Sequence, residues 1–125
     1  MTVLDASALL AFLFRESGHE QVATLLGTAC ISAVNLSEVL ARFVRDGHDA
    51  VEVARHLAQL PLEVVPFTSA DATATAALAS VTRDFGLSIG DRACLALAKS
   101  RSLPAVTADH AWTRRDLGVT VRVIR

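Results

Sequence analysis

Four acidic residues lie at the ends of predicted strands or in the first turns of predicted helices, where α/β proteins commonly bind ligands. Asp5 ends the apolar segment TVLD, Asp109 follows PAVT, Glu38 lies one turn into the helix after ACIS, and Asp91 begins the helix in GDRACLALAKSRS. Two carboxylates about 4 Å apart repel by roughly 4 kcal/mol at an effective dielectric of 20, so four in one cleft require a cation or shifted pKa values. An all-oxygen set suits Mg²⁺ or Mn²⁺, and acid clusters that hold two such ions are a recurring device for cleaving phosphodiesters.

Three of these acids also have a purely structural interpretation when each is taken alone. Asp5 and Asp109 can each cap the helix that follows, as aspartate commonly does. Glu38 can form an exposed pair with Arg42 one turn along its helix, worth about 0.3–0.5 kcal/mol. The functional interpretation requires instead that the polar face of this helix, which carries Glu38 and Asn35, lines a cleft.

Asp91 is the least easily explained by structure alone. It shares one helical stripe with Cys94, Leu95 and Ala98, although such a stripe should be apolar. The segment SIGD also matches a capping box, with Ser88 as the cap. A capping box does not require the apolar stripe, and it therefore explains Asp91 only in part.

Two further residues are set aside from the site. Asp116 is a fifth acidic candidate, but it comes late in its predicted helix, beside Arg114 and Arg115, and we interpret it as solvated. His110 neighbours Asp109, but a single histidine on a short helix is interpreted as incidental.

Short apolar segments alternate with helix signals along the chain. The predicted strands are residues 2–5, 29–32, 62–67, 104–107 and 119–124. The predicted helices are residues 6–14, 17–27 with Ser17 as cap, 33–47, 49–60, 69–86 with Ser69 as cap, 90–102 and 109–118. This alternation predicts one α/β domain over residues 1–125, with a mainly parallel sheet and helices on both faces. Open sheets of this kind bind ligands at the carboxyl ends of their strands.

The composition limits where the protein works and how it binds. The chain has 125 residues, a 52% hydrophobic content and a formal net charge of −1. Its longest apolar run, Ala8–Phe14, is too short to span a membrane, and we see no signal peptide, so we expect a cytoplasmic protein whose Cys30 and Cys94 are reduced, buried thiols. The charge argues against nucleic-acid binding through bulk electrostatics, so any such contact must be local.

Four segments together resemble the PIN-domain ribonucleases, and specifically the VapC toxins of type II toxin–antitoxin pairs. They are VLDASALLAFLF, ISAVNLSEVLARF, GLSIGDRACLALA and PAVTADHAW, in this order, and they extend over almost the whole chain. The resemblance implies a PIN-like fold with a central parallel sheet of about five strands. It implies that the acidic metal-binding quartet is Asp5, Glu38, Asp91 and Asp109. It also matches Ser7 and Thr107 to hydroxyl positions beside the first and last acids, and Asn35, Ser88 and Arg92 to positions that flank the site.

The same resemblance implies an activity and partners. PIN-domain toxins are Mg²⁺- or Mn²⁺-dependent endoribonucleases that use a metal-activated water, and many cut tRNA or ribosomal RNA. A cognate VapB-type antitoxin blocks the site, and homodimers are usual. Arg92 becomes a candidate phosphate contact, with a solvated outer-face position beside Lys99 as the structural alternative.

Two other classes of protein were weighed. A PIN-like module could bind RNA or a protein without cutting, but the intact quartet argues against it. A receiver-type phosphoacceptor domain needs an aspartate at the end of its middle strand and a lysine after its last strand. Here the middle strand ends in VVPF, and Lys99, the only lysine, lies in the middle of a helix.

Overall fold

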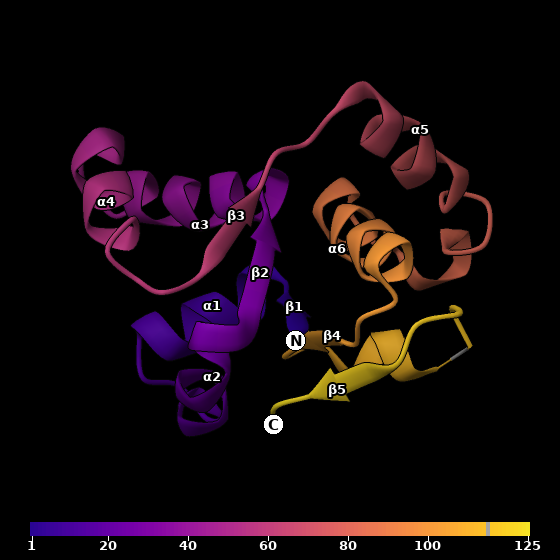
Figure 1. Ribbon diagram of the computed structural model, residues 1–125, viewed down its shortest axis with the longest axis horizontal. Helices are drawn as coiled ribbons and strands as arrows, with labels where there is room; N and C mark the ends of the chain where they lie inside the picture. The colour runs from indigo at the N-terminus through magenta and orange to yellow at the C-terminus, as the bar shows by residue number, and fades with distance from the viewer. Residues whose placement is uncertain (115) are drawn as a thin grey trace.

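A computed structural model describes residues 1–114 and 116–125 as a parallel β-sheet covered by helices on both faces (Figure 1). The strands are β1 (Thr2–Leu4), β2 (Ala29–Ser32), β3 (Glu63–Val65), β4 (Ala105–Thr107) and β5 (Val121–Val123). The α-helices are α1 (Ala6–Leu13), α2 (His19–Leu25), α3 (Ala33–Arg45), α4 (Ala50–Leu57), α5 (Ser69–Ala77) and α6 (Ile89–Arg101). Short 3₁₀ helices are η1 (Leu26–Thr28), η2 (Arg83–Phe85) and η3 (His110–Thr113). Among the described residues, no helix is both long and apolar enough to span a bilayer.

The sheet has the strand order β3-β2-β1-β4-β5, and every neighbouring pair of strands is parallel. Leu4 in the central strand pairs with Ile31 in β2 and with Val106 in β4. Because parallel strands all end at the same edge, Asp5 follows the central strand at the edge where β2 and β4 also end. The predicted parallel five-stranded sheet is confirmed.

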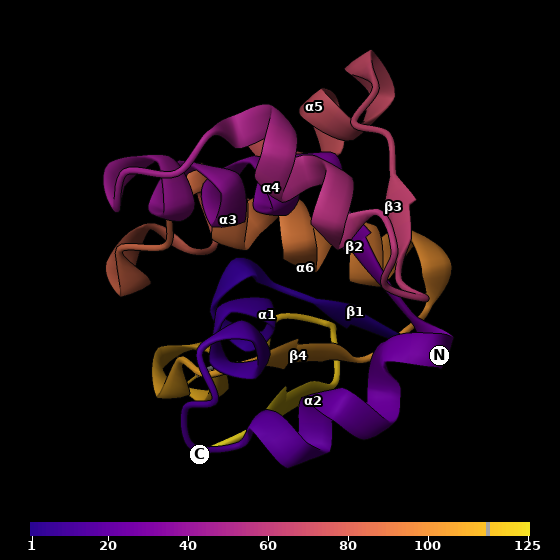
Figure 2. The same cartoon turned by 90° about the vertical axis from the view of Figure 1, so that its left-hand side faces the viewer.

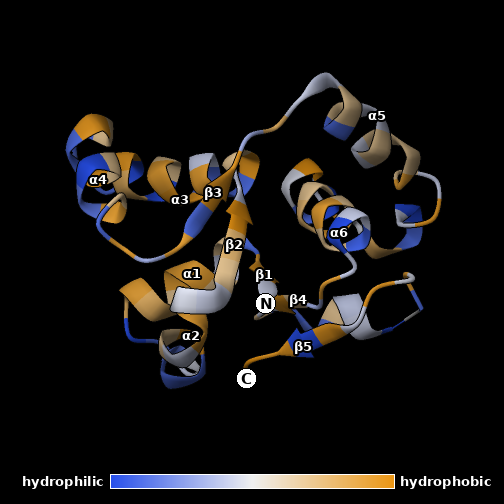
Figure 3. Ribbon diagram, in the orientation of Figure 1, coloured by the Kyte–Doolittle hydropathy of each residue, from blue (hydrophilic) through white to orange (hydrophobic). Residues whose placement is uncertain are grey.

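Both faces of the central strands are buried, and neighbouring residues along each strand face opposite sides. Figure 2 shows α1 and α2 on one side of β1 and β4, and Figure 3 shows α1 as mainly hydrophobic. On this side Leu4, Ile31 and Val106 pack with side chains of α1, α2 and α3. On the other side Val3, Cys30 and Ala105 pack with α6 and Trp112. Both cysteines are buried free thiols, as predicted.

The predicted helix over residues 69–86 is too long. Helix α5 ends at Ala77, and residues 83–85 form only a 3₁₀ turn before Gly86, which adopts a left-handed conformation. The alanine content of the segment favoured a long helix, but its β-branched residues favour helix less. The cap was also misplaced, because Thr68, and not Ser69, forms a capping box with Asp71.

Two other helix predictions need correction. Helix α2 begins after Gly18, which has a φ of +93°, and Ser17 is not its cap. A Cβ at Gly18 would meet the carbonyl oxygen of Ile124 at 2.5 Å, so the close approach of the C-terminal segment requires glycine here. The predicted helix over residues 109–118 is only the 3₁₀ turn η3, and Arg115 lies outside the described residues.

Candidate functional site

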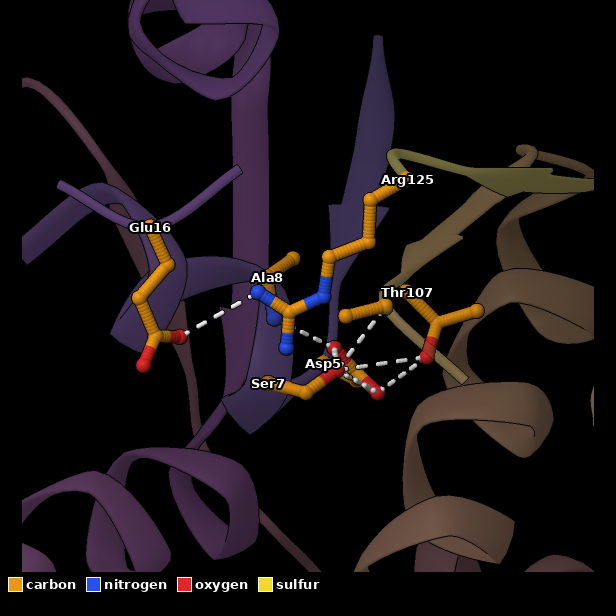
Figure 4. A network of polar contacts seen from close by, with 7 residues as sticks. Asp5, Ser7, Ala8, Glu16, Thr107 and Arg125 are labelled. Atoms are coloured by element: carbon orange, nitrogen blue, oxygen red, sulfur yellow. Dashed lines mark hydrogen bonds and ion pairs between the residues drawn. The ribbon is translucent and has the colours of Figure 1, made fainter. Parts of the chain in front are cut away.

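Asp5 is a buried carboxylate that accepts several hydrogen bonds at the centre of the sheet edge (Figure 4). Only 3% of the residue is exposed. Its Oδ1 accepts from the Ala8 backbone N–H at 2.8 Å, which makes Asp5 the cap of α1 as predicted. Ser7 Oγ lies 2.7 Å from Oδ1 and 2.9 Å from Oδ2, and Thr107 Oγ1 donates to Oδ2 at 2.6 Å.

The two hydroxyl groups are oriented by the backbone of the segment after β4. Ser7 Oγ accepts from the Ala108 N–H at 2.9 Å, and Thr107 Oγ1 accepts from the Asp109 N–H at 3.1 Å. Since each hydroxyl carries one hydrogen and already accepts from the backbone, that hydrogen is free to point at Asp5. The structure therefore brings together three of the residues expected at the site, Asp5, Ser7 and Thr107.

Three of the four acids influence each other electrostatically. Burial raises the pKa of Asp5 to about 6, although the hydrogen bonds from Thr107, Ala8 and Ser7 act to lower it, and the charge of Asp91 raises it further. Burial also raises the pKa of Glu38, and the charges of Asp91 and Asp5 add to that rise. A group of acids whose ionised forms disfavour one another is an environment in which a cation is stabilised.

Asp91 is placed by the predicted capping box at the start of α6. Its backbone N–H donates to Ser88 Oγ at 3.2 Å, and its Oδ2 accepts from the Ser88 N–H at 2.9 Å. The next turn of α6 packs onto the sheet, with Cys94 and Leu95 buried. The structural interpretation of Asp91 is thus confirmed, and the same turn holds its charge near Asp5 and Glu38.

Glu38 lies against the first turn of α6 and does not pair with Arg42. Arg42 instead pairs with Asp46, at 3.4 Å, and lies over the Phe14 ring, 4.8 Å from its centroid, so the structural alternative for Glu38, a pair with Arg42, is not formed. Asn35 Nδ2 donates to Glu38 Oε1 at 3.3 Å and to the Gly90 carbonyl oxygen at 3.0 Å.

Asn35, which the sequence places on the polar face of its helix, is buried in the structure. Only 1% of the residue is exposed, because α6 packs over this side of α3. Gly90, in the first turn of α6, allows this close approach, since a Cβ there would overlap the Glu38 carboxylate. Gly90 was not among the predicted site residues, although a glycine within a helix is a known sign of close packing.

The remaining candidate residues are held by other contacts. Asp109 is exposed and caps η3, with its Oδ1 accepting from Ala111 N–H at 2.9 Å. Arg92 donates from Nη1 to the carbonyl oxygen of Thr75 at 3.3 Å, and it thereby joins α6 to the end of α5. Asp116 is exposed, as predicted, and its Oδ1 accepts from Gly118 N–H at 2.8 Å.

The donor set fits a hard divalent cation by its chemistry. Asp5, Glu38 and Asp91 offer only oxygen ligands, as Mg²⁺ and Mn²⁺ prefer, and the charge of Asp91 helps to raise the pKa values of Asp5 and Glu38. Within residues 1–114 and 116–125, however, no three His, Cys, Asp or Glu side chains are arranged so that they could hold a metal ion. The fit therefore rests on ligand type and electrostatics, and the spacing of these side chains does not by itself define a coordination sphere.

A groove of about 610 Å³ opens beside Glu38. Its walls come from the start of α3, the start of α6 and the segment after β3. The lining residues are Ala33, Val34, Ser37, Glu38, Phe67, Ser88, Ile89 and Gly90. The groove is largely apolar, and Glu38 is the acidic residue in its lining. A ligand with an extended shape can reach Glu38 through this groove.

The chain belongs to the PIN domain family, whose model matches residues 2–117. No curated protein sequence matches it. Among solved structures, it is similar to the DNA-bound VapBC of Salmonella typhimurium, with a TM-score of 0.73 at 19% identity over 99% of this chain and 98% of that one. A toxin–antitoxin complex from Klebsiella pneumoniae gives 0.72 at 16% identity, with 96% of each chain covered. The sarcin–ricin loop cleaving toxin VapC20 of Mycobacterium tuberculosis gives 0.72 at 15% identity, over 90% and 93% of the two chains.

Proposed function

We propose that this protein is a VapC-type toxin, an endoribonuclease that hydrolyses RNA phosphodiester bonds with Mg²⁺ or Mn²⁺. The observation that carries the proposal is the buried Asp5, which is held by Ser7 and Thr107 and is coupled electrostatically to Glu38 and Asp91. A buried acid close to other acids is unfavourable for stability, so its presence indicates a function. Membership of the PIN domain family supports a nuclease.

Some residues would bind the metal ion, and others would orient those metal ligands. Asp5, Glu38, Asp91 and Asp109 would hold the cation, and when bound it supplies a water of lowered pKa and offsets negative charge on the phosphate. Ser7 and Thr107 keep the Asp5 oxygens in a fixed orientation. Ser88 fixes the turn that carries Asp91. Asn35 donates a hydrogen bond to the Glu38 carboxylate.

The first prediction tests cleavage with a matched pair of variants. Asp91 and Asp71 both occupy the third position of a helix and close a capping box, but no contact connects Asp71 to Asp5 or Glu38. Purified protein with Mn²⁺ should cleave a structured RNA, Asp91→Asn should lose at least about 100-fold in rate, as expected for loss of a group that stabilises the transition state, and Asp71→Asn should retain the rate. Persistent cleavage by Asp91→Asn would contradict the proposal.

A module that binds without cutting is the alternative. The observation in its favour is that, in the part of the chain that the structure describes, no three acids or other metal ligands are gathered for a metal. Calorimetric titration with Mn²⁺ separates the two proposals. Saturable binding that weakens in Asp91→Asn supports the nuclease, whereas no binding at millimolar Mn²⁺ supports the alternative.

The proposed partners are a VapB-type antitoxin, an RNA such as tRNA or ribosomal RNA, and a second copy of the chain. The similarity to toxin–antitoxin complexes supports the antitoxin. Exposed apolar side chains are available for interfaces, among them Val51, Val81 and Ile89. We propose that the activity is cytoplasmic. A small neighbouring gene whose product copurifies with the chain and inhibits cleavage would support the toxin assignment.

A further inference from the structure

We propose that Asn35 and Gly90 together position Glu38, through the Asn35 amide that bridges the two residues and the space that Gly90 leaves for the Glu38 carboxylate. This inference rests on the proposed function, because it assigns a role to two residues that contact a proposed metal ligand. Asn35 lies in the first turn of α3 and Gly90 in the first turn of α6, so the device joins the two helices that carry Glu38 and Asp91.

The orientation of the Asn35 amide follows from its neighbours. Nδ2 lies 3.3 Å from Glu38 Oε1 and 3.0 Å from the Gly90 carbonyl oxygen. Exchanging the amide nitrogen and oxygen would set an acceptor against two acceptors, so this amide has one satisfactory orientation. In that orientation Oδ1 is buried and has no hydrogen-bond partner among the described residues.

An unpaired buried oxygen is a cost that packing alone does not explain. An apolar side chain at position 35 would fill the space between α3 and α6 without that cost. The two donor hydrogens of Nδ2 are what the asparagine adds, and one of them is directed at the Glu38 carboxylate. The asparagine therefore supplies a donor that can orient the Glu38 carboxylate.

Gly90 supplies the space that the carboxylate occupies. A Cβ built at this position overlaps Oε1 and Cδ of Glu38 and approaches Oε2 at 2.9 Å. Its backbone is not in the left-handed region that demands glycine, and alanine is the better residue for a helix. The absence of a side chain is thus unfavourable for α6, but it allows Glu38 to lie beside Asp91.

The decisive variant is Gly90→Ala, with Gly27→Ala as its matched control. A Cβ at Gly27 meets nothing within 4 Å, and this glycine also has no left-handed backbone. We expect Gly90→Ala to weaken Mn²⁺ binding, measured by calorimetry, by about 10- to 100-fold, as for other residues that orient metal ligands. Its thermal unfolding midpoint without added metal should not fall. Gly27→Ala should bind Mn²⁺ as the wild type does.

Two further variants test whether the effect passes through Glu38. Once Glu38→Ala has removed the carboxylate, adding Gly90→Ala should weaken Mn²⁺ binding no further, because coupled residues are not additive. Asn35→Ala should likewise weaken binding alone and add nothing in the Glu38→Ala background.

The outcomes separate the positioning role from the proposed function. Additive effects, unchanged binding by Gly90→Ala, or a loss of binding matched by a fall in the unfolding midpoint would each overturn the positioning role. If the wild-type protein binds no Mn²⁺ at all, the proposed function itself fails.

Discussion

At the scale of single residues, Asp5 holds a charge where a neutral side chain would be more stable. Burial raises its pKa from 3.8 to about 6. Because the folded state binds this proton more tightly than the unfolded state does, the folded state is favoured at low pH, where both are protonated. The free energy of unfolding therefore falls as pH rises from about 4 to 6, and it stays low above that window.

This linkage gives a prediction for Asp5→Asn. Each tenfold change in proton affinity is worth about 1.4 kcal/mol, so the wild type should lose up to roughly 3 kcal/mol of stability between pH 4 and pH 7 through Asp5. Asp5→Asn cannot ionise, so it should be more stable than the wild type at pH 7 while lacking cleavage. Urea unfolding in EDTA at several pH values measures how the free energy of unfolding changes with pH in the wild type and in Asp5→Asn. Equal slopes for the two proteins would show that Asp5 is not the titrating group.

Some of the site residues could be predicted from the sequence, and the environment of others could not. Asp5 and Asp109 were predicted as site residues because the ends of strands can be recognised from the local sequence. Asp91 was predicted because a charged residue at the start of an apolar helix face is unusual. Asn35 was predicted only to flank the site from the polar face of its helix, since the pattern of α3 alone does not show that this residue is buried. Its burial depends on Gly90, which lies 55 positions away in sequence, and local patterns carry no information on such a contact.

At the scale of elements, two helices begin with the same device and differ only in location. Ser88 and Asp91 form the capping box of α6, and Thr68 and Asp71 form that of α5. Ser88 also lines the groove beside Glu38, whereas Thr68 does not. The pair therefore separates the contribution of capping to stability from its contribution to the site.

We predict that Ser88→Ala and Thr68→Ala each lower the free energy of unfolding by about 1 kcal/mol, the usual cost of losing a cap. Only Ser88→Ala should also slow RNA cleavage, because it loosens the turn that holds Asp91. Urea unfolding and cleavage rates on one set of proteins test this. Equal cleavage rates for the two variants would mean that the α6 cap supports folding alone.

The elements themselves were largely predictable from the sequence. The second strand was predicted at residues 29–32, where β2 lies, because an apolar segment is bounded there by a loop and a helix cap. Residues 69–86 were misjudged because alanine content indicates helix propensity but not where packing ends a helix. The 3₁₀ geometry of η3 was missed, since its capping aspartate is the same as that of an α-helix.

At the scale of the whole molecule, the charge distribution limits how the proposed RNA substrate would be held. The formal net charge is −1, and several arginines are engaged within the protein: Arg42 with Asp46, Arg101 with Glu63, and Arg125 with Glu16. Figure 4 shows the pair of Arg125 and Glu16. Because acidic residues balance the basic ones over the whole chain, we expect affinity for RNA to depend on groups close to the cut.

This distribution predicts a shallow dependence of RNA affinity on salt. For single strands, the slope of log K against log salt is about −0.7 for each phosphate neutralised, so two or three contacts give a slope of about −2. Binding of the non-cleaving Asp91→Asn variant to RNA, measured by fluorescence anisotropy over a range of KCl, tests it. A slope near −5 would reveal an extended basic surface that the sequence does not suggest.

The strand order has a consequence for the time at which the protein becomes active. Asp5 follows the central strand, but one of its hydrogen-bond donors, Thr107, lies 102 positions later, at the end of β4. Chains are synthesised from the N-terminus, and early segments fold first. A nascent chain can therefore pair β1 with β2 while its acidic edge is still incomplete, and a chain interrupted before β4 has no assembled centre. Under the proposed function, translation itself would thus delay the appearance of an activity that acts on the RNA of the cell that makes it.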